Sequence, residues 1–258
     1  MKIQRTPRGM AARVFLWAHR GASAYAPENT LLAFSRAIED GADGIELDVR
    51  SALGGTLVVA HDEALDRVAP EWAGRSISLM SPVELAKVEL VSRSGVRTQG
   101  IPTLDQAFDF IVGKGRAVNI EVKGDGPDRL EIAVMVSRWL RKRSRQELEY
   151  CLVSSFYPRI LLALRHLAPR VQLGLVCNME HTGRIGSNIL ASFLCIDAIH
   201  PHHHLVNPKS IATWKQKQLK IRVWTVNQRS LAKWLAGLDV FEFITDDPKE
   251  LGLAFEEN

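Results

Sequence analysis

The sequence is poor in cysteine and contains no long uncharged apolar run. Its three cysteines, Cys151, Cys177 and Cys195, each lie within an apolar stretch and match no metal-ligand spacing. We therefore expect small buried side chains and no disulfide. No segment reaches the length of about 18 apolar residues that a membrane-spanning helix needs, and the N-terminus lacks an apolar core before a small-residue cleavage site. These absences predict a cytoplasmic protein without stable membrane insertion.

The excess of basic residues is also small, with a formal net charge of +4 over 258 residues. That excess suits a small anionic substrate, but it is too weak and too dispersed for a nucleic-acid-binding surface. The densest basic run, residues 138–145, lies at the end of a predicted helix. Cations there complement the helix dipole, so we interpret the run as a solvated helix end.

Short apolar runs alternate with helical patterns along the whole chain, and this alternation predicts parallel βα units. Helical patterns cover residues 30–40, 130–143 and 230–238, among others. The candidate strands are residues 14–19, 44–48, 57–61, 117–123, 150–156, 172–177, 198–201, 221–226 and 241–245.

The second and third candidate strands are separated by only eight residues, too few for a parallel crossover. We expect a hairpin with a turn centred on Gly54 and Gly55, which sets Asp48 opposite His61. The third run then extends the second strand, and eight strands remain. The sequence therefore predicts an α/β fold, a TIM barrel of eight βα units.

Residues 62–102 fit no βα unit and contain one short helical candidate at 81–90. A helix start is expected near Thr103, where the sequence is Thr-Leu-Asp-Gln. We therefore expect a single domain over residues 1–258, with an insertion at about 62–102 above the barrel.

Polar side chains gather at the predicted C-terminal ends of the barrel strands, where such barrels carry their active sites. Because residues i and i+2 of a strand point the same way, Glu46 and Asp48 share a face, as do Glu121 and Lys123. Three carboxylates facing one cavity repel each other unless a cation neutralises them. Oxygen ligands of this kind predict one divalent cation, Mg²⁺ or Ca²⁺.

Cationic and titratable side chains complete this predicted site. Arg20 offers a forked donor to phosphoryl oxygens, and Lys123 offers a second positive charge. An imidazole ordinarily titrates near neutrality, so His19 and His61 are the predicted general acid and base. Each of these residues alone is more often structural, but a barrel would otherwise hold apolar side chains at these strand ends. Their convergence therefore favours catalysis of a reaction at phosphorus.

Ordered motifs now identify a resemblance. The segment WAHRGASAYAPENTLLAFSRAIEDGADGIELDVRSALGGTLVVAHDEALDR resembles the opening of the glycerophosphodiester phosphodiesterase family, with HRG, PENT, E-x-D and HD elements in order. The later segments PTLDQAF, NIEVK, SSF, VWTVN and ITDDP agree with it. The resemblance spans roughly residues 19–248. Two features depart from the family: the SALGGTL hairpin, and DVFEFITDDP, which brings Glu242 and two phenylalanines to the last strand.

The resemblance implies a TIM barrel with a small inserted subdomain. It also implies metal-dependent hydrolysis of glycerophosphodiesters, small-molecule substrates, to glycerol 3-phosphate and an alcohol. Carried onto this sequence, it makes His19 and His61 the acid/base pair and Glu46, Asp48 and Glu121 the metal ligands. The resemblance also implies that Arg20 and Lys123 bind the phosphate. Glu28 would lie near the glycerol or support the strand ends, and Trp224 would pack beside the substrate.

Two other functions remain open at this point. A lysophospholipase D acting on acylated substrates predicts an apolar groove, for which Trp72, Leu79 and Met80 are candidates. A non-catalytic phosphate-binding barrel would keep the strand ends without turnover, although intact histidines and carboxylates argue against it. The run His200 to His204 favours solvated or substrate-adjacent imidazoles over a zinc site. His166 and His181 receive no role.

Overall fold

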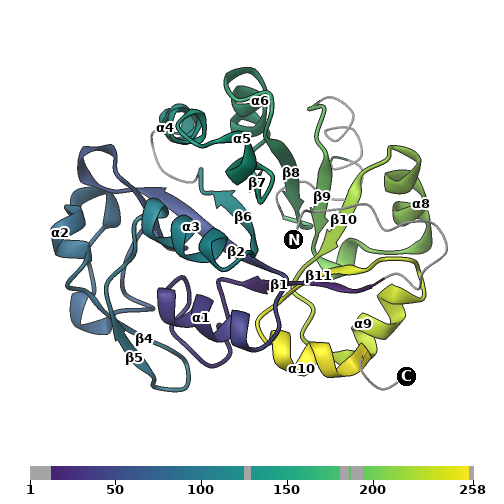
Figure 1. Ribbon diagram of the computed structural model, residues 1–258, viewed down its shortest axis with the longest axis horizontal. Coiled ribbons are helices and arrows are strands. Elements are labelled where there is room, and N and C mark those ends of the chain that lie inside the picture. Colours follow the sequence, from purple (N-terminus) through teal and green to yellow (C-terminus); the bar gives the residue numbers. More distant parts are fainter. Residues whose placement is uncertain (1–12, 125–128, 181–185, 187–193, 256–258) are drawn as a thin grey trace.

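The computed structural model describes residues 13–124, 129–180, 186 and 194–255, and within them a closed parallel barrel. The sheet order is β1, β11, β10, β9, β8, β7, β6, β2, and a further pairing of β1 with β2 closes the ring. Figure 1 shows this ring surrounded by helices, so the predicted TIM barrel is confirmed. The strands are β1 (Phe15–His19), β2 (Gly44–Ser51), β6 (Ala117–Val122), β7 (Cys151–Ser155), β8 (Gln172–Cys177), β9 (Ala198–Pro201), β10 (Lys220–Val223) and β11 (Glu242–Thr245).

Amphipathic helices cover the outside of the barrel (Figure 1). α1 turns Ala33, Phe34 and Ala37 inward, and together the helices and the outer strand faces form the main hydrophobic core. Thr103 caps α3 reciprocally with Gln106, which confirms the helix start predicted there. The described helices of the barrel are α1 (Leu31–Glu39), α3 (Leu104–Gly113), α4 (Arg129–Arg141), α5 (Arg145–Leu148), α6 (Pro158–Leu167), α8 (Pro208–Gln216), α9 (Arg229–Ala236) and α10 (Pro248–Gly252). Within the described ranges, no helix is long and apolar enough to cross a membrane.

Large side chains fill the barrel interior from below the strand ends. Trp17 is fully buried, and Arg222 stands over its ring with 5.3 Å from Cζ to the ring centroid. Arg222 Nε lies 2.6 Å from Glu242 Oε2. The unusual Glu242 of the last strand therefore pairs with a buried guanidinium, since an isolated buried charge is unfavourable.

Glycine at position 44 makes room for the Trp17 ring. A Cβ at Gly44 would lie 2.6 Å from two ring carbons of Trp17. We expect Gly44→Ala to destabilise the fold by about 1–3 kcal/mol, the usual range for overpacking a filled core. Urea unfolding measures this change. The matched control is Gly113→Ala in α3, where a Cβ meets nothing within 4 Å. Equal stability of the two variants would contradict the packing argument.

The β2–β3 hairpin forms as expected, but its predicted register is wrong by one residue. β3 (Leu57–Val59) is antiparallel to β2, and Val49 pairs with Val59. Asp48 therefore faces Ala60, whose N–H donates to the Asp48 carbonyl at 3.0 Å, and not His61. The turn is a three-residue 3₁₀ segment, η1 (Leu53–Gly55), with left-handed Gly54 (φ 77°) and Gly55 (φ 81°) in place of a two-residue turn.

Residues 62–102, the insertion, lie to one side of the barrel beyond β2 and β3 (Figure 1). They contain two 3₁₀ segments, η2 (Pro70–Trp72) and η3 (Ile77–Leu79), and pack around a separate apolar cluster that includes Leu65, Ile77 and Leu85. The helix predicted at 81–90 is too long: α2 covers only Pro82–Leu85. The chain then enters β4 (Glu89–Val91), which pairs with β5 (Arg97–Gln99). Pairing with β5 and burial of Leu90 in the separate cluster outweigh the local helical pattern.

The prediction that all three cysteines are buried is only partly correct. Cys151 and Cys177 are buried, as predicted, but Cys195 is exposed in a left-handed backbone position (φ 48°).

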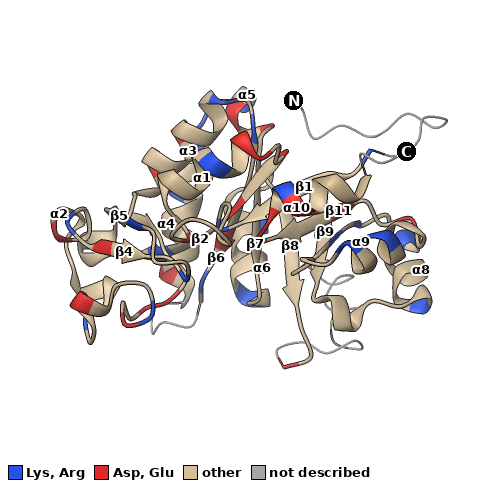
Figure 2. Ribbon diagram, turned by 90° about the horizontal axis from the view of Figure 1, so that it is seen from below, with Lys and Arg blue, Asp and Glu red and all other residues tan. Residues whose placement is uncertain are grey.

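Basic and acidic residues are interspersed along the ribbon (Figure 2). In the basic run, Arg143 is bound by Asp105 and by Asp109, the latter at 2.8 Å.

Candidate active site

The rim, meaning the C-terminal ends of the barrel strands, begins with the His19-Arg20-Gly21 turn. Arg20 adopts a left-handed backbone (φ 58°), and its N–H donates to the Glu46 carbonyl at 2.8 Å and to Glu46 Oε2 at 3.1 Å. Gly21 follows at φ 84°, where a Cβ would lie 2.7 Å from the Ala33 backbone at the start of α1. Only glycine lets the strand turn this tightly against the helix.

Three buried carboxylates meet at this rim, as the strand-face argument predicts. Glu46, Asp48 and Glu121 each offer one oxygen within 4.8 Å of the others. The parallel register of β2 and β6 sets Asp48 beside Glu121. Glu46 Oε1 is buried without a hydrogen-bond partner. An orphaned buried oxygen within a carboxylate cluster fits a hard divalent cation, so these residues are suitable ligands for Mg²⁺ or Ca²⁺.

Two members of the carboxylate cluster have pKa values shifted in opposite directions. Burial raises the pKa of Glu46 well above its ordinary value, and the charges of Asp48 and Glu121 raise it further. Burial would also raise the pKa of Asp48, but Lys123 and Arg20 outweigh it and hold that pKa far below the ordinary value. A third negative charge at Glu46 is therefore disfavoured unless a cation offsets it, which a divalent ion bound by the cluster would do.

Arg20 and Lys123 are both bound to these carboxylates. Arg20 Nε lies 3.1 Å from Asp48 Oδ2, and Arg20 Nη1 donates to Glu28 Oε1 at 3.0 Å. Lys123 Nζ lies 2.7 Å from Asp48 Oδ1 and also contacts Glu121. Burial works against the charged ammonium of Lys123, but Asp48 and Glu121 outweigh it and raise the pKa of Lys123. Both cations are thus held charged at the cavity.

His19 is oriented by an aspartate that the strand-end argument did not include. Asp246, at the end of β11, lies 2.6 Å from His19 Nδ1 through Oδ1. Asn227 donates to Asp246 Oδ2 at 2.7 Å, and Ser23 donates to Oδ1 at 3.2 Å. Burial opposes ionisation, but these hydrogen bonds lower the pKa of Asp246 to about 2. An ionised Asp246 holds the Nδ1 proton of His19 and leaves Nε2 for proton transfer.

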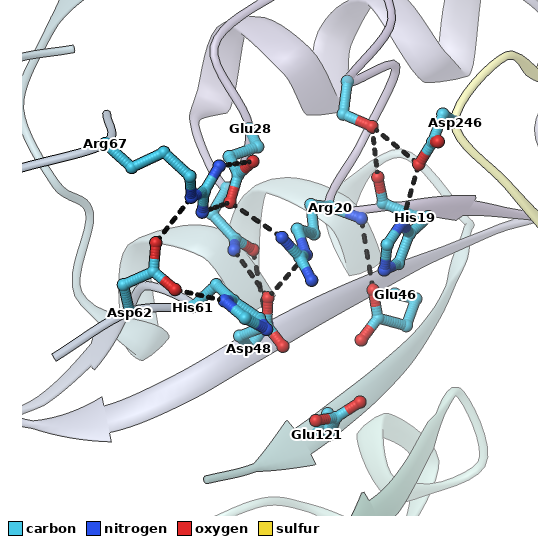
Figure 3. Close-up of polar contacts among 12 residues, drawn as sticks. His19, Arg20, Glu28, Glu46, Asp48, His61, Asp62, Arg67, Glu121 and Asp246 are labelled. Atoms are coloured by element: carbon cyan, nitrogen blue, oxygen red, sulfur yellow. Dashed lines mark hydrogen bonds and ion pairs between the residues drawn. The ribbon is translucent and has the colours of Figure 1, made fainter. Parts of the chain in front are cut away.

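His61 has an equivalent partner. Its Nδ1 lies 2.6 Å from Asp62 Oδ1, and Arg67 Nε donates to Asp62 Oδ2 at 2.6 Å. Arg67 also clamps Glu28 with two hydrogen bonds of 2.7 Å. Figure 3 shows the resulting chain from His61 through Asp62, Arg67 and Glu28 to Arg20. Arg67 belongs to the insertion, so the insertion helps to orient both His61 and Arg20.

The pKa of His61 lies below the ordinary histidine value. Burial is the largest cause; Asp48 opposes the shift, while the charges of Lys123 and Arg20 add to it. His61 is therefore neutral at neutral pH and able to accept a proton.

These groups line a cavity of about 220 Å³ at the centre of the rim. Trp224 and Phe156 form its aromatic wall, edge to face with ring centroids 5.6 Å apart. Trp224 Nε1 donates to the His200 carbonyl at 2.8 Å. A wider cleft of about 720 Å³ adjoins it between the rim and the insertion, sharing His19 and Arg20. The site thus offers a small charged chamber for a phosphoryl group and a roomier space beside it.

The histidines from His200 to His204 differ in their exposure to solvent. His200 is fully buried in the barrel interior, 3.2 Å from Arg222 Nη1, so the expectation of a solvated loop is wrong for it. The reason is that His200 belongs to β9 and its ring fills the space beside Gly174, where a Cβ would lie 2.7 Å from His200 Nε2. His202 and His203 are half-buried, and His204 is exposed. His166 is exposed on α6, and His181 lies outside the described residues.

The predicted apolar groove does not form from its three candidates. Met80 is buried in the core of the insertion, Trp72 packs against that core beneath Arg75, and Leu79 is 74% exposed.

Sequence reasoning gave no role to four residues that contact the site, Asn29, Asp62, Arg67 and Asp246. They fall inside the PENT, HDEALDR and ITDDP segments, which were the available signal.

Comparison with known proteins agrees with this geometry. Residues 19–250 match the Glycerophosphoryl diester phosphodiesterase family. A glycerophosphodiester phosphodiesterase of Caldanaerobacter subterraneus subsp. tengcongensis is 32% identical over 91% of this chain and 94% of its own. A phosphodiesterase of Oleispira antarctica, solved in complex with the product sn-glycerol-3-phosphate, superposes with a TM-score of 0.82 at 26% identity, over 94% of this chain and 97% of that one. The glycerophosphodiester phosphodiesterase of Thermotoga maritima gives a TM-score of 0.73 at 26% identity, over 93% and 97%.

Proposed function

Because this chain belongs to the glycerophosphoryl diester phosphodiesterase family, we propose that it hydrolyses glycerophosphodiesters to glycerol 3-phosphate and an alcohol. One observation carries the proposal: three buried carboxylates, with Glu46 Oε1 unpartnered, cluster beside a small cavity lined by two histidines that are each held by an aspartate. The substrate is a small molecule, and the Oleispira antarctica relative with its bound product supports that choice.

The carboxylates Glu46, Asp48 and Glu121 are the proposed ligands of one divalent cation, Mg²⁺ or Ca²⁺. When bound, the cation polarises phosphoryl oxygens and offsets the negative charge that builds up in the transition state. The cluster itself is held in place by its surroundings. Asn29 Nδ2 donates to Asp48 Oδ2 at 2.8 Å, and Lys123 bridges Asp48 and Glu121.

His19 and His61 are the proposed acid/base pair. Each presents Nε2 for proton transfer because an aspartate occupies Nδ1. The low pKa of His61 suits it to accept a proton at neutral pH. His19 ends β1, His61 follows β3 by two residues, and both line the cavity proposed for the phosphoryl group.

The remaining residues bind and orient the substrate. We assign Arg20 and Lys123 to the phosphoryl oxygens, because both are half-buried, charged and at the cavity wall. Glu28 supports the rim by joining Arg20 to Arg67, and Trp224 with Phe156 forms the apolar wall beside the substrate. We interpret residues 1–258 as one barrel domain whose insertion at 62–102 contributes Arg67. A cytoplasmic location stays a prediction from the sequence.

A panel of head-group diesters tests the function. Glycerophosphocholine and glycerophosphoethanolamine, each incubated with Mg²⁺ or Ca²⁺, should give glycerol 3-phosphate and the free alcohol, followed by phosphorus NMR. A lysophospholipase D would instead prefer the acylated lipid in the same assay, and a binding-only barrel would turn over none of them. Either outcome would reject the proposal.

Asp246→Asn should lower kcat by about 10-fold to 100-fold, part of the roughly 10²-fold to 10⁴-fold that an acid/base histidine contributes. The amide cannot hold the Nδ1 proton of His19 as an ionised carboxylate does. Steady-state kinetics measure the change. Asp239→Asn is the control, because Asp239 lines neither rim cavity and forms an exposed ion pair with Lys215. A kcat equal to that of the control would show that Asp246 does not position His19.

A further inference from the structure

Three adjacent imidazoles, His202, His203 and His204 (the His triplet), gather just past the end of β9. Their ring centroids are 4.3 Å apart for the first pair, 4.2 Å for the second and 4.8 Å between the outer two. Among the described residues, the His triplet and the carboxylates Glu46, Asp48 and Glu121 are the two clusters able to offer three metal ligands. Nothing in the proposed reaction uses the His triplet.

The backbone of the His triplet is anchored on both sides. The N–H of His202 donates to the Cys177 carbonyl of β8 at 2.8 Å, and the N–H of His203 donates to the Trp224 carbonyl at 2.8 Å. The chain then enters the 3₁₀ segment η4 (His203–Leu205), in which the N–H of Leu205 bonds back to the His202 carbonyl. The His202 ring also packs edge-on against Trp224, with centroids 4.9 Å apart. The imidazoles therefore project from a fixed support beside the rim.

The spacing of the ring nitrogens suits one ion. One nitrogen from each ring lies within 4.8 Å of the others. Two nitrogens bound to one zinc at about 2.0–2.1 Å lie at most about 4.2 Å apart, so modest side-chain rotations close the set. The contact at His202 must give way: its Nδ1 accepts from the His204 N–H at 3.4 Å, which is long for a hydrogen bond and weakly held.

We propose that His202, His203 and His204 bind one imidazole-preferring transition-metal ion of the Zn²⁺, Ni²⁺ or Cu²⁺ class. Neutral imidazole suits these ions, whereas Mg²⁺ and Ca²⁺ prefer the oxygen ligands of the carboxylate cluster. Three ligands from one short segment leave the solvent side of the ion open to water or an anion, because His204 is exposed. The chain would thus carry two ion sites of different chemistry on one rim.

Isothermal titration with Ni²⁺ tests this site on the full chain prepared without a polyhistidine tag. An excess of Mg²⁺ is present throughout to hold the carboxylate cluster. The wild type should bind one equivalent of Ni²⁺, and the double variant His202→Gln/His204→Gln should bind it at least about 100-fold more weakly, since even outer-shell changes cost 10-fold to 100-fold. His166→Gln, an exposed histidine on α6, is the matched control and should bind like the wild type.

Two outcomes overturn the proposal: no Ni²⁺ binding by the wild type under these conditions, or equal binding by the wild type and the double variant. Should the double variant fail to fold by circular dichroism, the electron paramagnetic resonance spectrum of Cu²⁺ bound to the wild type decides instead. Couplings to several imidazole nitrogens support the site, and a spectrum with oxygen ligands alone rejects it. None of these readouts depends on phosphodiesterase activity.

Discussion

Replacing His61 with alanine is expected to lower kcat by about 10²-fold to 10⁴-fold, equivalent to about 3–5 kcal/mol of transition-state stabilisation. His61 lines the central cavity, and Asp62 holds its Nδ1 at 2.6 Å, so removal of the ring removes a positioned proton carrier. The same loss is expected for His19→Ala, whose ring is held by Asp246 at 2.6 Å. Initial rates with glycerophosphocholine and saturating Mg²⁺ measure both variants.

His166→Ala is the control, since that imidazole is exposed and bonds only to the Leu162 carbonyl of its own helix among the contacts described. A diester with an activated aryl leaving group separates the two roles, because such an alcohol departs without a proton. The variant that lacks the general acid should recover most of its activity on that substrate, and the variant that lacks the base should not. Near-native turnover by either alanine variant on glycerophosphocholine would refute the acid/base assignment.

The acid limb of the pH profile follows from the same residue. A base must be neutral to accept a proton, and the pKa of His61 is lowered by burial and by the nearby cations Lys123 and Arg20. Activity should therefore persist as the pH falls through the ordinary histidine value of about 6.5 and decline only below it. Bound divalent cation shifts the pKa of His61 in the same direction, because it adds positive charge. An acid limb centred above that ordinary value would contradict the assignment.

Removal of the divalent cation is expected to abolish turnover, and Glu121→Gln should weaken cation binding by at least about 100-fold, more than the 10-fold to 100-fold typical of outer-shell changes. The buried carboxylates of Glu46, Asp48 and Glu121 repel one another, and Glu46 Oε1 has no protein partner. A neutral amide at position 121 removes one of the three charges that attract the ion. Chelation followed by Mg²⁺ or Ca²⁺ titration measures both effects.

Direct binding provides a second readout for this prediction. Mn²⁺ in place of Mg²⁺ can be counted by electron paramagnetic resonance, which separates loss of the ion from loss of chemistry. Glu180→Gln is a suitable control, because Glu180 is an exposed residue outside the rim cavities. Full activity after exhaustive chelation would reject the metal-dependent mechanism, and unchanged Mn²⁺ affinity in Glu121→Gln would remove Glu121 from the ligand set.

Much of the candidate site could be predicted because it depends on local periodicity. Residues i and i+2 of one strand share a face, so Glu46 with Asp48 and Glu121 with Lys123 were expected together, and the structure brings all four to one cluster. The rim as the place of convergence followed from eight parallel strands. The hairpin register could not be obtained in this way, because one extra residue in the turn at Gly54 and Gly55 shifts every pairing.

Local sequence patterns could not identify the residues that orient the catalytic side chains. Asp246 lies 227 residues after His19, and the two meet only because β1 pairs with β11 when the barrel closes. Arg67 reaches Glu28 because the insertion lies beside the rim in the folded chain. Each partner is set by distance in space, and the local periodicity of strands and helices carries no information about that distance.

The sequence by itself determined the strand and helix alternation, the eightfold parallel barrel, and a strand-end set that begins with His19 and Arg20. Periodic burial sets those features, and it is visible in single segments. Only the tertiary structure decided that Glu242 pairs with a buried Arg222, that His200 is interior while the His triplet is half-buried or exposed, and that an aspartate lies against His19 and another against His61. Those outcomes depend on barrel closure, since buried charges and imidazoles take whichever partners the closed ring brings within hydrogen-bonding distance.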